Sequence, residues 1–204
     1  MKTLISFFVI MVVMLVACNK DQFVQDEQPP TLKKAKVPVP MKADFCMKAT
    51  DNPDTPGLDI IPVSGAPALF PIKAIHSYSK ISGHATHMGE INTELSYSIT
   101  TRCDYIDNDP DGFSPNDEIW MESHGRITVA NGDSYAFIHS TPLVAKLNLL
   151  YSGVLILPYT GEVTMSDGTG RFEGATGKVM MVGQTDLVAK TNCWTADGFM
   201  QYAP

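Results

Sequence analysis

Alternation of apolar and polar residues, position by position, is the feature that most limits how this chain can fold. It is clearest between residues 94 and 105, where every second residue belongs to one of two sets. The first set is Leu95, Tyr97, Ile99, Thr101, Cys103 and Tyr105, and the second is Glu94, Ser96, Ser98, Thr100, Arg102 and Asp104. A helical period would place Leu95 and Ile99 with Arg102, whereas a strand sends the two sets to opposite faces. The segment is therefore predicted to be a half-buried strand.

The same period of two recurs along residues 39–204. Apolar residues hold alternate positions in two further segments, namely Met41, Ala43, Phe45 and Met47, and Ile119, Met121, Ile127 and Val129. Asn131-Gly132 lies between two alternating runs and predicts a hairpin with a type I′ turn, which needs positive φ at both central residues. Leu147–Leu157 is apolar enough to predict a strand buried on both faces. Many short strands with regular turn signals and no helical stripe predict an all-β sandwich or barrel with little or no helix.

Three short glycine-containing motifs resemble segments of one protein family. Gly168–Gly177 (GTGRFEGATG) resembles the GTGxFxxATG segment of allene-oxide-cyclase-like barrels, to which the plant dirigent proteins belong. Ser82–Gly89 (SGHATHMG) and Val129–Asp133 (VANGD) are similar to two elements of its bacterial members. The resemblance implies an antiparallel barrel of about eight strands and, as in the plant branch, a homo-oligomer. It supplies no catalytic residue, because the polar lumen residues of that family have no matched positions here.

The first residues indicate export. Met1-Lys2-Thr3 gives a short positive start, and the apolar run Leu4–Val16 is shorter than the roughly 20 residues that span a bilayer. This is typical of a signal peptide, and Leu15-Val16-Ala17-Cys18 resembles the lipobox of bacterial lipoproteins, in which cleavage precedes an acylated cysteine. The alternative is an ordinary secretory signal with a chance cysteine. We therefore expect a signal peptide over 1–17, a lipidated Cys18 with a polar tether over 18–38, and one domain over 39–204.

The residues after Cys18 bear on localisation. Asn19 replaces the Asp that retains some lipoproteins at the inner membrane, and Lys20-Asp21 looks like a signal for surface export. We therefore predict a lipid-anchored protein of the outer membrane, on the cell surface or the periplasmic face.

Composition limits the partners and the cysteine chemistry. Without residues 1–17 the chain has 14 basic and 22 acidic side chains, and no basic cluster in its body that would bind nucleic acid. The expected partners are the membrane, through the anchor, and a small apolar ligand. With Cys18 acylated, Cys46, Cys103 and Cys193 permit at most one internal disulfide, whose pairing the sequence leaves open.

An acidic segment, Asp107–Glu118, satisfies the calcium-loop pattern D-x-[DN]-x-[DN]-G-x5-E at every defined position. The pattern predicts a Ca²⁺ site with carboxylates of Asp107, Asp109 and Asp111, the carbonyl of Phe113 and a bidentate Glu118. The alternative is a solvated acidic hairpin loop, because Asp, Asn, Pro and Gly are also turn residues.

Two function classes follow from these features. No G-x-S-x-G, H-E-x-x-H or Cys/His pairing offers a nucleophile, so we expect a non-catalytic binding or structural lipoprotein. The alternative is a cyclase- or isomerase-like enzyme, or a carrier, acting on an apolar small molecule in the barrel lumen. The predicted inward faces are mostly Leu, Ile, Met and Tyr, which favours a packed core over a hollow one.

Overall fold

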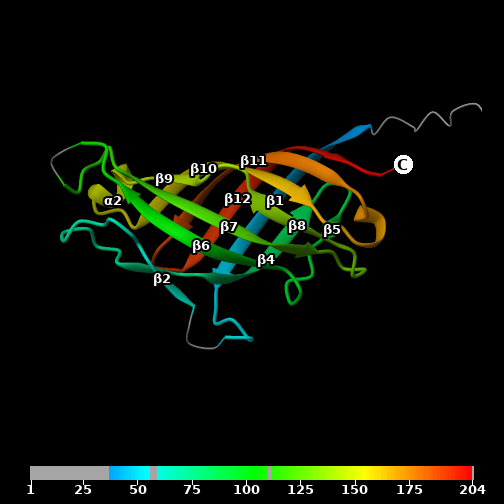
Figure 1. The fold of residues 1–204 in the computed structure, drawn as a ribbon, viewed down its shortest axis with the longest axis horizontal. Coiled ribbons are helices and arrows are strands. Elements are labelled where there is room, and N and C mark those ends of the chain that lie inside the picture. Colours follow the sequence, from blue (N-terminus) through cyan, green and yellow to red (C-terminus); the bar gives the residue numbers. More distant parts are fainter. Residues whose placement is uncertain (1–36, 56–58, 110–111, 204) are drawn as a thin grey trace, which may run out of the picture. The chain divides into compact units, whose positions relative to one another are not determined.

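The computed structural model describes residues 37–55, 59–109 and 112–203. The predicted signal peptide, Cys18 and most of the predicted tether lie outside these residues. The described residues form twelve strands (Figure 1): β1 (Pro38–Ala49), β2 (Ile60–Pro62), β3 (Ala74–His76), β4 (Tyr78–Ala85), β5 (Gly89–Glu90), β6 (Tyr97–Ile106), β7 (Glu118–Thr128), β8 (Ser134–His139), β9 (Leu143–Lys146), β10 (Ile156–Ser166), β11 (Thr176–Asp186) and β12 (Thr191–Gln201). The described helices are one turn each, α2 (Asn148–Tyr151) and η1 (Gly170–Phe172).

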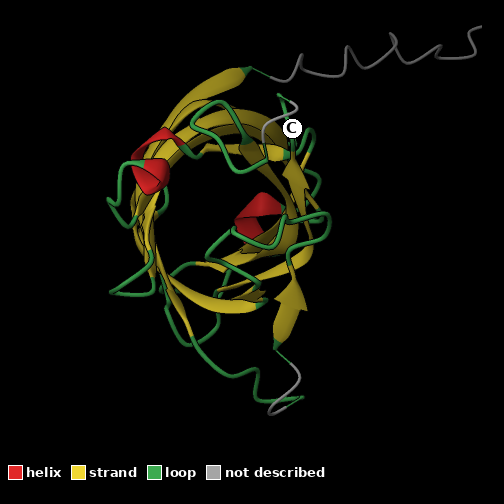
Figure 2. Cartoon of the chain, turned by 90° about the vertical axis from the view of Figure 1, so that its left-hand side faces the viewer, coloured by secondary structure: helices red, strands yellow, loops and turns green. Residues whose placement is uncertain are grey.

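Eight of the strands close into a ring, which Figure 2 shows end-on. Its order is β1-β12-β11-β10-β8-β7-β6-β4, and the pairing of β4 with β1 completes it. Neighbouring strands of the ring are antiparallel, and β9 continues the path of β8 between β7 and β10. The described structure is 59% strand and 4% helix. The prediction of a barrel-like all-β fold with about eight strands is therefore confirmed.

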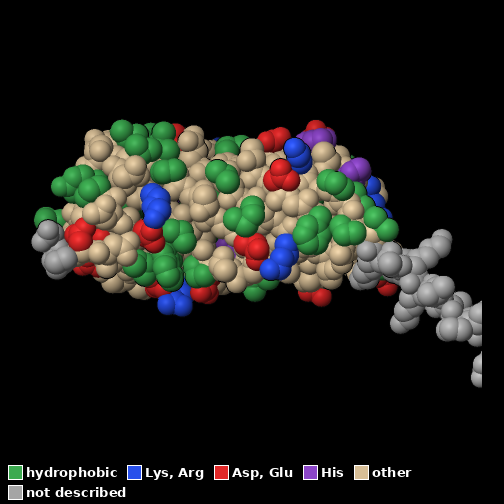
Figure 3. Space-filling view, turned by 90° about the horizontal axis from the view of Figure 1, so that it is seen from above, with side chains coloured by type: hydrophobic (Ala, Val, Ile, Leu, Met, Phe, Trp, Pro, Cys, Tyr) green, Lys and Arg blue, Asp and Glu red, His purple; other side chains and the backbone are tan. Residues whose placement is uncertain are grey.

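Alternation in β1 and β12 directs one set of side chains into the ring. Met41, Ala43 and Phe45 are buried. Their partners on β12 also face the interior of the ring, Trp194 and Ala196 among them. Each Met, Phe or Leu side chain that is fully buried in this way contributes about 1.5–3 kcal/mol. The outward positions are mixed, and Figure 3 shows acidic, basic and single hydrophobic side chains interspersed on one face.

Strand β6 departs from the single predicted face. Its register with β7 shifts between Thr100 and Arg102, as in a β-bulge, and one extra residue exchanges the inward and outward sets. After the bulge Cys103 and Tyr105 are buried, as predicted. Before it the prediction was wrong, because Ser98 is only 2% exposed whereas Leu95 is 55% exposed. The bulge therefore directs the hydroxyl groups of the first half of β6 into the ring.

The hairpin between β7 and β8 is present, but its turn is of another type. Gly132 has φ +92°, whereas Asn131 is not among the residues with positive φ. The backbone N–H of Gly132 donates to the carbonyl of Val129, and that of Val129 to the carbonyl of Asp133. This is the three-residue loop of a type I turn followed by a left-handed glycine, so the type I′ prediction was wrong.

The predicted strand over Leu147–Leu157 was also wrong. Leu147 and Leu150 are buried, but α2 occupies the middle of the segment, and Val154 and Leu155 are 43% and 46% exposed. Because β9 and β10 are antiparallel neighbours, the chain has to reverse between them, and these residues form the connection.

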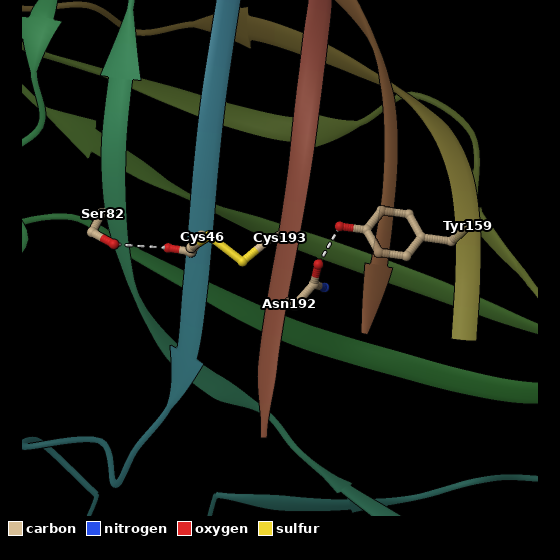
Figure 4. The surroundings of a disulfide bond; sticks show 5 residues. All are labelled: Cys46, Ser82, Tyr159, Asn192 and Cys193. Carbon is tan, nitrogen blue, oxygen red and sulfur yellow. Dashed lines mark hydrogen bonds between the residues drawn. A yellow bond between two sulfur atoms is a disulfide. The ribbon is translucent and has the colours of Figure 1, made fainter. Parts of the chain in front are cut away.

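A disulfide joins Cys46 of β1 to Cys193 of β12 (Figure 4). The two residues are directly opposite in the register, with their Cα atoms 4.1 Å apart, although 147 positions separate them in the sequence. Cys103 is the buried free cysteine of the described residues. The pairing that the sequence left open is therefore Cys46–Cys193.

Candidate ligand-binding cavity

One end of the ring is closed by the segments that carry the Gly-rich motifs. Arg171 donates to the carbonyl of Met88 at 2.9 Å and lies 3.7 Å from the carboxylate of Asp133. Phe172 of η1 is fully buried, with its ring against those of Tyr135 and Tyr202. Figure 2 shows η1 within the outline of the ring. The three motifs thus meet in one place and pack as a plug, which is a structural role.

The opposite end of the ring opens into a cavity of about 410 Å³, the mouth cavity. Its lining comes from β3 and from residues near the ends of β1, β11 and β12, including Ala49, His76, Asp186 and Thr191. Deeper in the ring lies a second space of about 60 Å³, the inner chamber. Both spaces are lined by Met47, Thr100, Met121 and Asn192, so they are adjacent. The lumen is therefore incompletely filled at this end, although the sequence favours a packed core.

Flexible apolar side chains form most of the inner chamber. Five methionines line it together with aromatic residues, namely Met41, Met47, Met121, Met165 and Met181 with Phe45, Phe137 and Trp194. Methionine has three rotatable bonds and a polarizable sulfur, so it adapts its shape to apolar contents. No Lys, Arg, Asp or Glu is among the described residues that line this chamber.

A short row of polar side chains crosses the wall of the inner chamber. The hydroxyl groups of Thr100 on β6 and Ser123 on β7 are 3.0 Å apart and share a hydrogen bond. On the next strand, β8, His139 lines the same chamber. Strands β7 and β8 are antiparallel, and His124 lies opposite Ile138. Ser123, one residue before His124, is therefore beside His139, one residue after Ile138. The three side chains form one polar strip in a mostly apolar wall, which Ser98 and Asn192 also line.

His139 is the unusual member of this strip. Its Nδ1 atom is buried and has no hydrogen-bond partner among the described residues. Burial lowers the pKa of the imidazole from 6.5 to about 4, although a hydrogen bond with the backbone of Met121 opposes the shift. The ring is therefore neutral near pH 7 and presents an unused polar nitrogen. A second such atom, Nδ1 of His76, lies in the wall of the mouth cavity.

Asn192 stands where the two spaces join, and its side chain is held in place. Tyr159 of β10 donates its hydroxyl hydrogen to Oδ1 of Asn192, reaching across β11 (Figure 4). The crossing passes Gly183, where a Cβ atom would lie 2.7 Å from the tyrosine hydroxyl. Burial raises the pKa of Tyr159, so the phenol stays protonated as the donor. The absence of a side chain at Gly183 thus permits the contact that fixes Asn192.

The acidic loop lies between β6 and β7, and the structure brings together part of the predicted calcium site. Carboxylate oxygens of Asp107, Asp109 and Asp117 lie within 4.8 Å of one another, and Asp111 falls outside the described residues. Asp117 is fully buried and accepts hydrogen bonds from the hydroxyl of Tyr105 and from the backbone N–H groups of Asn108 and Ser114. Burial raises the pKa of Asp117, but these hydrogen bonds outweigh it and the net pKa is lowered.

The other predicted calcium ligands have different surroundings. The carboxylate of Glu118 pairs with Lys146 and accepts a hydrogen bond from Nε1 of Trp120 at 2.9 Å. The ring of Phe113 packs against Phe70 and Tyr151. Calcium binding at this loop stays a prediction, with Asp117 as a group that the sequence pattern did not include.

The polar strip of the lumen was also missed from the sequence. A signal for one member was present, because Ser123 shares the alternate positions of Ile119 and Met121 and so belongs to the inward face. Thr100 was placed on the outward face, since the bulge after it leaves no mark in the polarity pattern.

Comparisons of the chain with protein-family models, with curated proteins and with solved structures gave no match. Within residues 37–55, 59–109 and 112–203, no helix has the length and hydropathy needed to cross a bilayer.

Proposed function

We propose that this chain is an exported lipoprotein, anchored to the outer membrane through an acylated Cys18, whose barrel-like domain binds a small apolar molecule without catalysis. The observation that carries the binding function is the pair of adjacent spaces at the open end of the ring, the mouth cavity of about 410 Å³ and the inner chamber of about 60 Å³. Ligand sites in proteins are typically concave, mostly apolar and roughly 300–1,000 Å³ in size, with a few polar groups that fix orientation. The methionine-rich wall and its polar strip have this composition.

The disulfide supports export. Disulfides persist in oxidising compartments and are rare where thiols are kept reduced. The Cys46–Cys193 bond therefore agrees with the signal-peptide pattern of residues 1–17 and the lipobox resemblance of residues 15–18.

The direction of β1 supports access to the cavity. Its first residue, Pro38, pairs with Gln201 near the plugged end of the ring, and its last residue, Ala49, lines the mouth cavity. The mouth cavity is thus at the other end of β1 from Pro38, where the proposed tether ends.

A second candidate function is isomerase-like chemistry on the same ligand, and the observation that favours it is His139. Its unpartnered Nδ1 atom is positioned to accept a proton from a bound molecule, although burial lowers the pKa to about 4 and so makes the imidazole a weaker base than an ordinary histidine. Recovery of the ligand and its analysis by chromatography and NMR separates the two functions, because a binding protein returns the ligand unchanged whereas an isomerase returns a rearranged product of the same mass.

Tryptophan fluorescence tests the binding function. The chain has two tryptophans, and Trp194 is 7% exposed in the inner chamber whereas Trp120 is 39% exposed. In a Trp120→Phe protein, bromooctane should quench Trp194 saturably, because bromine quenches tryptophan on contact. Ala196→Phe, which fills the chamber, should abolish the quenching, whereas the matched Ala130→Phe on the exposed hairpin should not. Quenching that never saturates, or that survives Ala196→Phe, contradicts the proposal.

A further inference from the structure

The size of the inner chamber restricts what can enter it. A cavity of roughly 150 Å³ holds a benzene ring in another protein, and the inner chamber, with about 60 Å³, is less than half that size before its methionines move. It therefore accepts the narrow end of a chain rather than a ring. The mouth cavity, with about 410 Å³, accommodates the rest of such a molecule, and the two spaces meet at Met47, Thr100, Met121 and Asn192.

The polar strip defines the chemistry of that narrow end. Nδ1 of His139 is a buried polar atom without a partner among the described residues, and a buried group in that state stabilises whatever ligand satisfies it. The hydroxyls of Thr100 and Ser123 already bind each other at 3.0 Å. His139 is thus the member of the strip with a buried polar atom that makes no hydrogen bond, whereas the hydroxyls of Thr100 and Ser123 are each partly satisfied.

The charge of the chamber distinguishes between polar end groups. Burial keeps the imidazole of His139 neutral near pH 7 by lowering its pKa to about 4, and no Lys or Arg is among the described lining residues. A carboxylate would lose its hydration there without gaining a countercharge. A hydroxyl group is neutral, and it both donates and accepts, so it pairs with either tautomer of the imidazole.

We propose, resting on the lumen-binding function above, that the ligand is a linear molecule with a hydroxyl terminus, which enters the inner chamber and hydrogen-bonds to His139. The apolar chain lies against the methionines, and the remainder of the molecule occupies the mouth cavity. The strip of Thr100 and Ser123 extends the polar surface around the terminus.

Octanol, nonane and heptanoate test this, because they have equal numbers of non-hydrogen atoms and differ in the end group. Their affinities are measured by calorimetry for the full-length lipoprotein in detergent, for His139→Phe, and for the control His124→Phe at an exposed, outward-facing histidine. Detergent takes up part of each ligand and so lowers the apparent affinities. This effect is the same for every protein, so it cancels when the ratio of octanol affinity to nonane affinity is compared between proteins. We expect that ratio to fall about tenfold in His139→Phe, the order of one satisfied buried hydrogen bond, and to be unchanged in His124→Phe.

A measurement on the unmutated protein keeps the inference testable if His139→Phe fails to fold. The ring ¹⁵N signal of His139, recognised because this histidine stays neutral to the lowest pH, should move on adding octanol and not on adding nonane. The hydroxyl assignment is overturned if the ratio of octanol affinity to nonane affinity is the same in the wild type and in His139→Phe, or if the ¹⁵N signal does not move. Either result leaves the lumen-binding function intact. Tighter binding of heptanoate than of octanol overturns the hydroxyl assignment as well. Failure of all three ligands to bind contradicts the lumen-binding function itself.

Discussion

Replacing His139 by Phe should change how the stability of the domain depends on pH. The imidazole has an ordinary pKa of 6.5 in the unfolded chain, and burial lowers the pKa to about 4 in the folded protein. Between these values the unfolded state binds the proton and the folded state does not, so the free energy of unfolding falls as the pH drops from about 6.5 to about 4. At 1.36 kcal/mol per pH unit, the full loss from this one group is about 3 kcal/mol.

Urea denaturation of the wild type and of His139→Phe at pH 7.5 and pH 4.5 measures this loss. Other groups titrate in both proteins, Asp117 and Glu118 with lowered pKa among them, so the His139 contribution is the difference between the two pH dependences. We expect the wild type to lose about 2–3 kcal/mol more than the variant. His124→Phe, at an exposed position, is the matched control and should behave as the wild type. Equal pH dependence in the wild type and His139→Phe would refute the burial of a neutral imidazole in the lumen.

Three further predictions concern the anchor, the disulfide and the acidic loop. Cys18→Ser should abolish metabolic fatty-acid labelling and release the protein from membranes, and a wild type that takes up no label contradicts the lipoprotein assignment. Alkylation without reductant in denaturant should label Cys103 and spare Cys46 and Cys193, as mass spectrometry would show; the double Cys46→Ser, Cys193→Ser variant should lose up to about 5 kcal/mol, because the bond spans 147 positions. Calorimetric titration of chelator-treated protein with Ca²⁺ should reveal one site that Asp109→Ala removes, and an absence of heat would mean that the loop depends on its internal hydrogen bonds alone.

The fold class could be predicted from the sequence because a half-buried strand alternates apolar and polar residues, and this alternation is visible within a few positions. In β1 the buried Met41, Ala43 and Phe45 are the residues that the alternation assigns to the inward face. The bulge in β6 is not visible in this way, since one inserted residue changes the facing of all later side chains without changing the composition. The prediction for Leu147–Leu157 was wrong for a different reason. A short apolar run looks the same in the sequence whether it forms a strand, a helical turn or an exposed connection.

The candidate site depends on features with a longer range than a local pattern. His139 acquires its character from burial beside residues of β6, β7 and β10, and Tyr159 reaches Asn192 only because Gly183 lies between them. The disulfide depends on the register of two strands at opposite ends of the chain. For the acidic loop, the calcium-loop pattern includes Asp107 and Asp109, whose carboxylates lie close to that of Asp117 in the structure. Asp117 is distinguished from its neighbours only by the hydrogen-bond donors that surround it in the folded loop.

Anomalous diffraction from crystals soaked in bromooctane is the most direct test of lumen binding. The account predicts one bromine peak inside the ring, beside Met121 and Asn192 where the mouth cavity and the inner chamber meet, with the methionine side chains rearranged around the bound alkyl chain. A lumen filled by those methionines, with no bromine inside the ring at a concentration that saturates quenching in solution, would contradict it.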